Sequence, residues 1–184
     1  VDAPDIPKKL EDIAAYRNLR SEHGKIHSHE DIFMGYKHFQ AKGIQPLFHF
    51  GYGLSYTKFS LSDLTIKNTS KGDSVAAEVS ITVKNEGSVS GSEVVQVYIS
   101  YPDNGITHPQ LQLRGFAKAR DLAPGSSSNV TISLDKYAVS YWDNNKHCWL
   151  VAVGEYGVHV GFSCDNIILG EKLKISEAFA WTGL

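Results

Sequence analysis

The sequence has little of several features that define other classes of protein. With two cysteines and one methionine in 184 residues, it is neither a disulfide-rich scaffold nor a zinc ribbon. It lacks the roughly 18 consecutive apolar residues of a transmembrane helix, and residues 1–5 do not begin a secretory signal. Neither sign of charge dominates, because 18 lysine and arginine residues oppose 20 aspartate and glutamate residues. A nucleic-acid-binding surface, a membrane segment and a disordered chain are therefore not expected.

The first residue is Val1 rather than methionine. We therefore expect the chain to be an excised or processed piece of a longer protein. A signal peptide of that longer protein would lie outside this sequence.

In contrast to cysteine and methionine, aromatic residues and glycine are abundant. The chain has nine Tyr, eight Phe, three Trp and 16 Gly, and aromatic side chains suit a pleated, half-buried surface. From Phe59 onward, apolar residues recur at every second position and are interrupted by turn-forming residues. About seven short strands are predicted, within residues 61–66, 75–83, 95–99, 111–116, 130–134, 156–162 and 173–175. This spacing is typical of a mainly β, immunoglobulin-like sandwich over residues 59–184.

Residues 1–58 have a different pattern. The apolar spacing over residues 10–16 gives one or two helical turns, and no long amphipathic helix follows. The aromatic rings between Phe33 and Tyr56 have no core of their own to pack against within this segment. We therefore expect an extended segment that does not fold alone, followed by a sandwich that does.

Two stretches of this segment resemble a known signature: residues 35–39 (GYKHF) and 43–59 (GIQPLFHFGYGLSYTKF). They are similar to the region of glycoside hydrolase family 3 that joins an α/β sandwich domain to a C-terminal fibronectin type III-like domain. Residues 91–98, 112–116, 154–156 and 179–184 also resemble that domain, in the form found in β-glucosidases of fungal type. The resemblance implies that residues 1–58 are the end of the α/β sandwich domain plus a linker, and that residues 59–184 are the fibronectin type III-like domain.

The resemblance also implies a function. Members of this family use an aspartate nucleophile in a Ser-Asp-Trp motif of an N-terminal barrel, and a glutamate acid/base from the α/β sandwich domain. Neither is matched here. The residues Ser62, Asp63 and Leu64 are not the Ser-Asp-Trp motif and open a predicted strand, and the acid/base region precedes Val1 in the family order. The chain is thus expected to be the non-catalytic C-terminal part of a retaining β-glucosidase, which cleaves terminal β-D-glucosyl residues without a cofactor. Its expected partners are the missing barrel and α/β sandwich domains, and the whole enzyme is expected to be secreted and to act in cellulose degradation.

Few residues are candidates for catalysis or metal binding. Glu30 and Asp31 form a carboxylate pair near the signature, but neighbouring strand residues point to opposite faces and do not flank one glycosidic bond. His27, His29 and Glu30 carry donors that suit a transition metal. A zinc site needs three or four ligands with supporting groups, and no second cluster accompanies these. We therefore assign no catalytic, substrate-binding or metal-binding residue.

An independent carbohydrate- or polymer-binding module is the alternative function. Four aromatic residues near predicted strand ends could stack on sugar rings: Tyr101, Tyr141, Trp142 and Trp149. The favoured interpretation is that Trp142 and Trp149 fill the core of the sandwich. A row of aromatic rings on one exposed face would favour the binding module instead.

Two covalent features are also expected. Asn68 and Asn129 begin N-x-Ser/Thr sequons next to predicted turns, where a glycan fits in a secreted protein. Cys148 and Cys164 lie on the two strands of a predicted hairpin, which could bring their Cα atoms within disulfide range. A disulfide and two free thiols both remain open.

Overall fold

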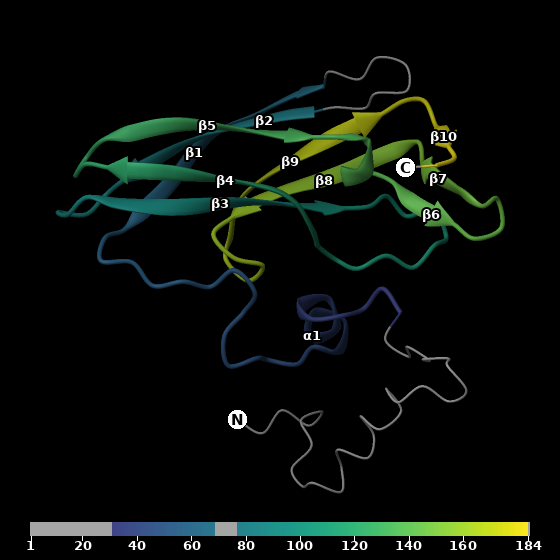
Figure 1. Cartoon of the computed structure of the whole chain (residues 1–184), viewed down its shortest axis with the longest axis horizontal. Helices are drawn as coiled ribbons and strands as arrows, with labels where there is room; N and C mark the ends of the chain where they lie inside the picture. Colours follow the sequence, from purple (N-terminus) through teal and green to yellow (C-terminus); the bar gives the residue numbers. More distant parts are fainter. Residues whose placement is uncertain (1–30, 69–76, 184) are drawn as a thin grey trace, which may run out of the picture. The chain divides into compact units, whose positions relative to one another are not determined.

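The computed structural model describes residues 31–68 and 77–183 (Figure 1). The chain divides into two compact units, Val1–His49 and Phe50–Leu184. The division comes before the boundary at residue 58 that the sequence suggested, because Phe50 and Gly51 hydrogen-bond to residues of the second unit.

The first unit contains one short helix, α1 (Tyr36–Lys42). Gly43 ends it in the left-handed conformation, with φ at 64°, which glycine adopts without steric cost. The Gly43 amide donates to the carbonyl of Gln40, and the Ile44 amide donates to that of Phe39. This part of the segment is therefore helical, where we expected an extended chain. The helical turns expected over residues 10–16 lie outside the described residues.

Two antiparallel sheets form the sandwich of the second unit (Figure 1). In the first sheet β2 lies between β1 and β5, and in the second the order is β4-β3-β8-β9. The seven strands are β1 (Phe59–Asn68), β2 (Ala77–Asn85), β3 (Gly91–Ser100), β4 (Gln112–Leu122), β5 (Ser127–Leu134), β8 (Gly154–Gly161) and β9 (Ile167–Ile175). Each overlaps one of the seven stretches predicted from alternation, and several extend beyond it, so the predicted sandwich is confirmed.

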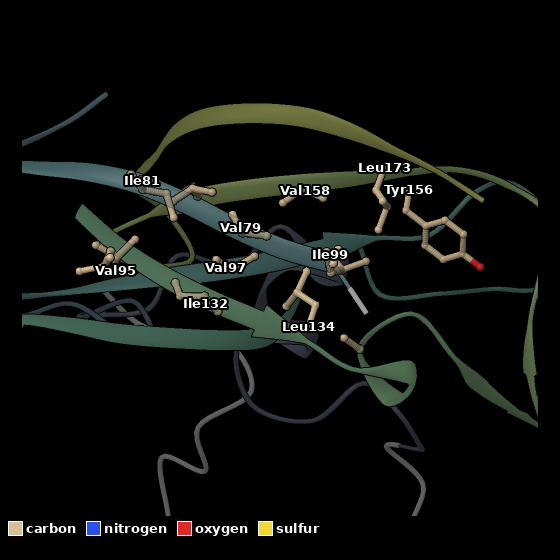
Figure 2. Packing of buried hydrophobic residues seen from close by; sticks show 14 of the residues in the cluster. Val79, Ile81, Val95, Val97, Ile99, Ile132, Leu134, Tyr156, Val158 and Leu173 are labelled. Atoms are coloured by element: carbon tan, nitrogen blue, oxygen red, sulfur yellow. The ribbon is translucent and has the colours of Figure 1, made fainter. Parts of the chain in front are cut away.

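Apolar side chains from both sheets fill the space between them (Figure 2). Fully buried members of this core include Val79, Ile81, Val83, Val95, Val97, Ile99, Leu134 and Val158. Burying a side chain of this size contributes roughly 1.5–3 kcal/mol. The alternation that predicted the strands thus also identified the residues that hold the two sheets together.

A third, smaller sheet lies at one end of the sandwich (Figure 1). Its central strand is β7 (Cys148–Val151), which pairs with β6 (Tyr141–Asp143) and with β10 (Phe179–Trp181). A 3-10 turn, η2 (Lys136–Ala138), precedes it, and the Asp135 side chain accepts the amides of Tyr137 and Ala138 there. Strands of three or four residues are too short to give a clear period of two, so the sequence did not predict this sheet.

No helix among the described residues has the length and apolar character required to cross a membrane.

Candidate functional site

The outer face of β3 is covered by the chain segment that precedes β1. Gln96 and Tyr98 point away from the core, yet both are buried. The Gln96 side-chain amide donates to the carbonyls of Gly51, at 3.3 Å, and Phe162, at 2.6 Å. The Tyr98 hydroxyl donates to Oε1 of Gln96 at 2.6 Å, which fixes the orientation of the carboxamide. We call residues 50–57 the strap, and Gln96 holds its first end.

Gly51 allows the strap backbone to approach the Gln96 side chain on β3 closely. A Cβ atom at this position would lie 2.4 Å from Oε1 of Gln96, and its φ of 86° disfavours other residues. The amide of Cys164 donates to the carbonyl of Phe50 at 3.0 Å and adds a backbone connection beside it.

The second end of the strap is held by Asn85, a fully buried carboxamide at the end of β2. Its Oδ1 accepts the hydroxyl of Thr57 at 2.6 Å and the amide of Gly87 at 3.0 Å. Its Nδ2 donates to the carbonyls of Val89 and Leu122, both at 2.8 Å. All the polar atoms of this side chain are therefore satisfied, as burial requires.

Between its two ends, the strap exposes large apolar side chains. The exposed fractions are 48% for Phe50, 54% for Tyr52, 90% for Leu54 and 102% for Tyr56. Residues 50–56 contain no charged side chain. An exposed apolar patch of this kind typically marks an interaction surface.

The three tryptophans of the sequence lie in one row across the third sheet. Trp149 on β7 is paired with Trp142 on β6 and with Trp181 on β10. Ring centroids of Trp142 and Trp149 are 5.7 Å apart with the rings at 75°, and those of Trp149 and Trp181 are 6.3 Å apart and nearly parallel. Directly paired residues point to the same face of a sheet, so the rings form a continuous row.

Groups from η2 pack against this row. The Tyr137 ring meets Trp149 and Trp181 edge-on, at 5.7 and 5.6 Å. Nζ of Lys136 lies 4.6 Å from the ring centroid of Trp181, within the range of a cation–π interaction. Trp149 and Trp181 are consequently half-buried, whereas Trp142 is 44% exposed.

Trp142 and Trp149 do not fill the core of the sandwich, so the favoured interpretation of these two residues was wrong. Neither belongs to the buried core, because β6 and β7 form a sheet of their own. The sequence did carry a signal for their pairing, since both flank the turn 144–147 at equal distance. The third ring, Trp181, is remote in sequence and could not have been added without the fold.

Tyr101 and Tyr141 form a second aromatic cluster, around His108. The Tyr101 and His108 rings stack at 4.6 Å, and Tyr141 meets His108 edge-on at 5.2 Å. The Tyr101 hydroxyl accepts from Arg114 at 2.6 Å and donates to the Ser140 carbonyl at 3.0 Å. Its burial raises the Tyr101 pKa, although the Arg114 charge opposes that shift. The four aromatic candidates for sugar binding thus divide between two clusters and do not make a single strip.

A retaining glycosidase site needs one acid with a raised pKa. Glu86 and Glu155 have the opposite shift: hydrogen bonds from Lys84 and Ser60 lower the pKa of Glu86, and pairing with Lys172 lowers that of Glu155. Asp31 is an exposed turn residue.

The metal candidates His27, His29 and Glu30 lie outside the described residues. Within residues 31–68 and 77–183, no group of three or more His, Cys, Asp or Glu side chains could hold a metal ion.

Both sequon asparagines are exposed. Asn68 is the last residue of β1, and its Nδ2 donates to the Lys174 carbonyl at 3.4 Å. Asn129 lies on β5, opposite Thr82. Its side chain is exposed, so it is accessible to a glycan.

Cys148 and Cys164 are buried and are not joined by a disulfide in this structure. The hairpin that was to bring them together does not form, because β7 pairs with β6 and β10 while β8 pairs with β3 and β9. Burial raises the pKa of the Cys164 thiol. The structure therefore supports the alternative in which both thiols stay reduced.

Comparison with known proteins agrees with the sandwich. A family model described as a fibronectin type III-like domain matches residues 93–164. Thermostable β-glucosidase B of Acetivibrio thermocellus is 37% identical over 175 residues, which are 95% of this chain and 23% of that protein. The chain thus spans between a fifth and a quarter of the length of the curated relatives it matches.

Solved structures show the same relationship. A β-glucosidase from Kluyveromyces marxianus in complex with glucose superimposes with a TM-score of 0.81 at 40% identity, covering 97% of this chain and 21% of that one. β-Glucosidase 3B from Thermotoga neapolitana, in complex with α-D-glucose, gives a TM-score of 0.80 at 35% identity over 87% of this chain and 22% of that one. The chain therefore belongs with the non-catalytic, C-terminal part of β-glucosidases, the part that contains their fibronectin type III-like domain.

Proposed function

We propose that the complete protein is a retaining β-glucosidase of glycoside hydrolase family 3, to which this chain contributes a non-catalytic domain. The observation that carries the proposal is the match itself. Nearly the whole chain aligns with β-glucosidases at 37–41% identity while covering only 20–23% of their length. The chemistry would then be performed by the barrel and α/β sandwich domains, which supply the nucleophile and the acid/base.

The role of this chain is to complete and stabilise that larger enzyme. Its sandwich has its own continuous core, as a domain that packs beside others requires. The pKa values of Glu86 and Glu155 are lowered, which is opposite to the shift that a general acid for glycosidic cleavage needs.

Activity assays on two proteins test the proposal. The complete protein should release nitrophenol from an aryl β-D-glucoside, and proton spectra should show β-glucose as the first product, since two displacements retain the configuration. The 184-residue chain should release none. A complete protein that is inactive on terminal β-glucosides, or that first releases α-glucose, would contradict it.

We further propose that the complete enzyme is secreted and acts on glucosides from cellulose. The two exposed sequons support secretion, because a chain receives N-linked glycans at such sites when it passes through the secretory pathway. Recovery of the native enzyme with its glycans from culture medium, and release of glucose from cellobiose, would test both points. An enzyme retained in the cell and free of glycans would contradict the first.

Carbohydrate binding is a second candidate function, favoured by the row of three tryptophans. Only Trp142 of this row is more than one-third exposed, so one sugar ring could stack on it. In a pull-down with insoluble cellulose, Trp142→Ala should then lose binding, while Phe116→Ala, which removes another exposed ring, should not. Equal retention of both variants and the unaltered chain would dismiss this function.

A further inference from the structure

The loop between β3 and β4 contains Asn104 followed by Gly105, the only Asn-Gly dipeptide in the 184-residue sequence. A glycine has no Cβ atom, so its amide nitrogen can approach the carboxamide of the preceding asparagine closely. A Cβ atom at Gly105 would meet nothing within 4 Å, and residues 105–107 are exposed. The dipeptide therefore lies in an open part of the loop, where water reaches it.

The Gly105 amide has a proton acceptor beside it. It donates to Oδ1 of Asp103 at 3.2 Å, and the Asp103 side chain is exposed. A carboxylate at this distance can take the amide proton while the nitrogen forms a new bond, which is the action of a general base. The nitrogen next to the Asn104 side chain is thus paired with a base.

Two donors polarise the carbonyl group of the Asn104 side chain. Its Oδ1 accepts the Ile106 amide at 3.1 Å and lies 3.3 Å from Nε2 of His108. The stack of the His108 ring on Tyr101 holds the second donor in place. Donors fixed at a carbonyl oxygen stabilise the negative charge that develops there when a nucleophile adds to the carbon.

The nitrogen of the same carboxamide is in a different position. Nδ2 of Asn104 is buried and makes no hydrogen bond to the residues that the structure describes. A hydrogen bond to this nitrogen would stabilise the intact amide, and its loss would oppose the departure of ammonia. The loop therefore holds the oxygen of the carboxamide and leaves its nitrogen without a partner.

We propose that Asn104 is a site of spontaneous deamidation that this loop promotes. The Gly105 nitrogen forms a bond to Cγ of Asn104, and its proton passes through Asp103 to the departing nitrogen. Ammonia leaves, and a five-membered succinimide ring remains. Water then opens the ring at one of its two carbonyl carbons and gives either aspartate or isoaspartate, in which the main chain is longer by one methylene group.

Both products change the surroundings of His108. Aspartate puts a negative charge on the group whose neutral oxygen lies 3.3 Å from Nε2 of His108, so it favours the protonated ring. Isoaspartate lengthens the loop that carries the stack of His108 on Tyr101. The loop thus acquires a carboxylate as the protein ages, without the action of another enzyme.

Peptide mapping of the aged 184-residue chain tests the proposal. After incubation at neutral pH, trypsin releases residues 85–114 and 137–146, and fragmentation assigns each conversion of amide to acid to one asparagine. Labelling with isoaspartate methyltransferase identifies the second product. Asn104 should be converted about tenfold faster than Asn144, because a base, a bare amide nitrogen and a polarised carbonyl act together only at Asn104.

Asn144 is a matched control because it shares the base and lacks the other two features. The amide of the following residue, Asn145, donates to Oδ1 of Asp143 at 2.9 Å. Asn145 carries a side chain, and within the described part of the chain no donor bonds Oδ1 of Asn144. Conversion of Asn104 no faster than that of Asn144 would overturn the proposal.

Two variants separate the effect of the loop from that of the dipeptide. Asp103→Ser keeps an oxygen that can accept the Gly105 amide but is no base, and His108→Phe keeps a ring on Tyr101 but has no donor. Each should slow conversion of Asn104 by about fivefold, less than in an enclosed enzyme site because water competes, and leave Asn144 unchanged.

Circular dichroism verifies that both variants are folded, since neither Asp103 nor His108 belongs to the core of the sandwich. If neither variant slows the conversion, the loop does not promote it and the proposal is wrong. None of these measurements uses β-glucosidase activity, so the outcome is independent of the proposed reaction.

Discussion

The buried carboxamide of Asn85 accepts the hydroxyl of Thr57 at 2.6 Å, and so joins the end of β2 to the segment that leads into β1. The same side chain bonds the Gly87 amide and two carbonyls. The Asn85 side chain therefore takes part in four hydrogen bonds, which connect β2 to three other parts of the chain.

Replacing this carboxamide should be costly. Asn85→Ala leaves the buried Leu122 carbonyl and its other partners without a hydrogen bond, and should lower the free energy of unfolding by about 2–4 kcal/mol. Urea denaturation of the 184-residue chain measures the change. Asn145→Ala, at an exposed turn position, is the control and should stay within about 0.5 kcal/mol. A loss at Asn85 no larger than that of the control would contradict the role given to its hydrogen bonds.

A second prediction concerns the close approach of β4 and β5. A Cβ atom at Gly115 would lie 2.5 Å from Cγ2 of Ile132 and 3.2 Å from Cδ2 of Leu134. Gly115→Ala should therefore lower the melting temperature, with a loss of about 1–3 kcal/mol from overpacking. Gly53→Ala adds the same methyl group where nothing lies within 4 Å and should be close to neutral. Equal melting temperatures for the two variants would show that the strands can separate without cost.

A third prediction concerns pH. Burial lowers the pKa of His108, which stacks on Tyr101, and of His159, whose Nε2 lies 2.9 Å from the Ser100 hydroxyl. In the unfolded chain both titrate near their ordinary pKa of about 6.5. Below that pH the unfolded chain binds protons that the folded chain does not. The free energy of unfolding should therefore be highest above about pH 7 and fall as the pH is lowered toward 5.5.

Variants separate this effect from general acid denaturation. His108→Gln and His159→Gln should each flatten the decline in the free energy of unfolding between pH 7 and 5.5. Asn145→Gln, at an exposed position, replaces a side chain that does not titrate and should leave the slope unchanged. Urea titrations at a series of pH values provide the measurement, and a slope that all three variants share would refute the assignment to buried histidines.

The thiols offer a fourth prediction. Cys148 and Cys164 are buried, and the Cys164 pKa is raised by burial, so little reactive thiolate reaches solvent at pH 8. Iodoacetamide should leave the native chain unmodified and add two groups once urea is present, with no reductant in either sample. If mass spectrometry finds two adducts only after reduction, the cysteines form a disulfide and the prediction of two reduced thiols is wrong.

Glycosylation remains a prediction from the sequence. The native enzyme should lose mass in this region on treatment with an endoglycosidase, and Asn68→Gln with Asn129→Gln should abolish that loss. Asn145 lies in no sequon, so Asn145→Gln should leave the mass difference unchanged. If endoglycosidase leaves the mass of the unaltered, natively produced protein unchanged, the prediction that Asn68 and Asn129 carry glycans is wrong.

The sequence predicted the sandwich because its strands are long enough for alternation to be read. Val79 and Ile81 on β2, for example, face the core at every second position. It could not predict β10, since three residues carry no period and the Trp181–Trp149 pairing joins remote parts of the chain. Helix α1 was missed for a related reason: seven residues without a buried member show no amphipathic pattern.

The sequence identified the strap as an aromatic segment from its composition alone. The hydrogen bonds that hold its two ends could not be predicted, because nothing near Gln96 or Asn85 in the sequence indicates what their carboxamides bind. The hydrogen-bond partners of these buried side chains are backbone groups that are remote in sequence. Such groups become neighbours only when the chain has folded.

The gathering of Trp142, Trp149 and Trp181 in one row makes the intrinsic fluorescence of this chain a local optical signal. None of the three emitters lies in the central core, where Tyr156 is the large ring. Fluorescence therefore reports on the small sheet, while far-ultraviolet circular dichroism reports on all the strands. If the fluorescence changes at a lower urea concentration than the circular dichroism, the end of the sandwich opens before the rest, as a separate cooperative unit.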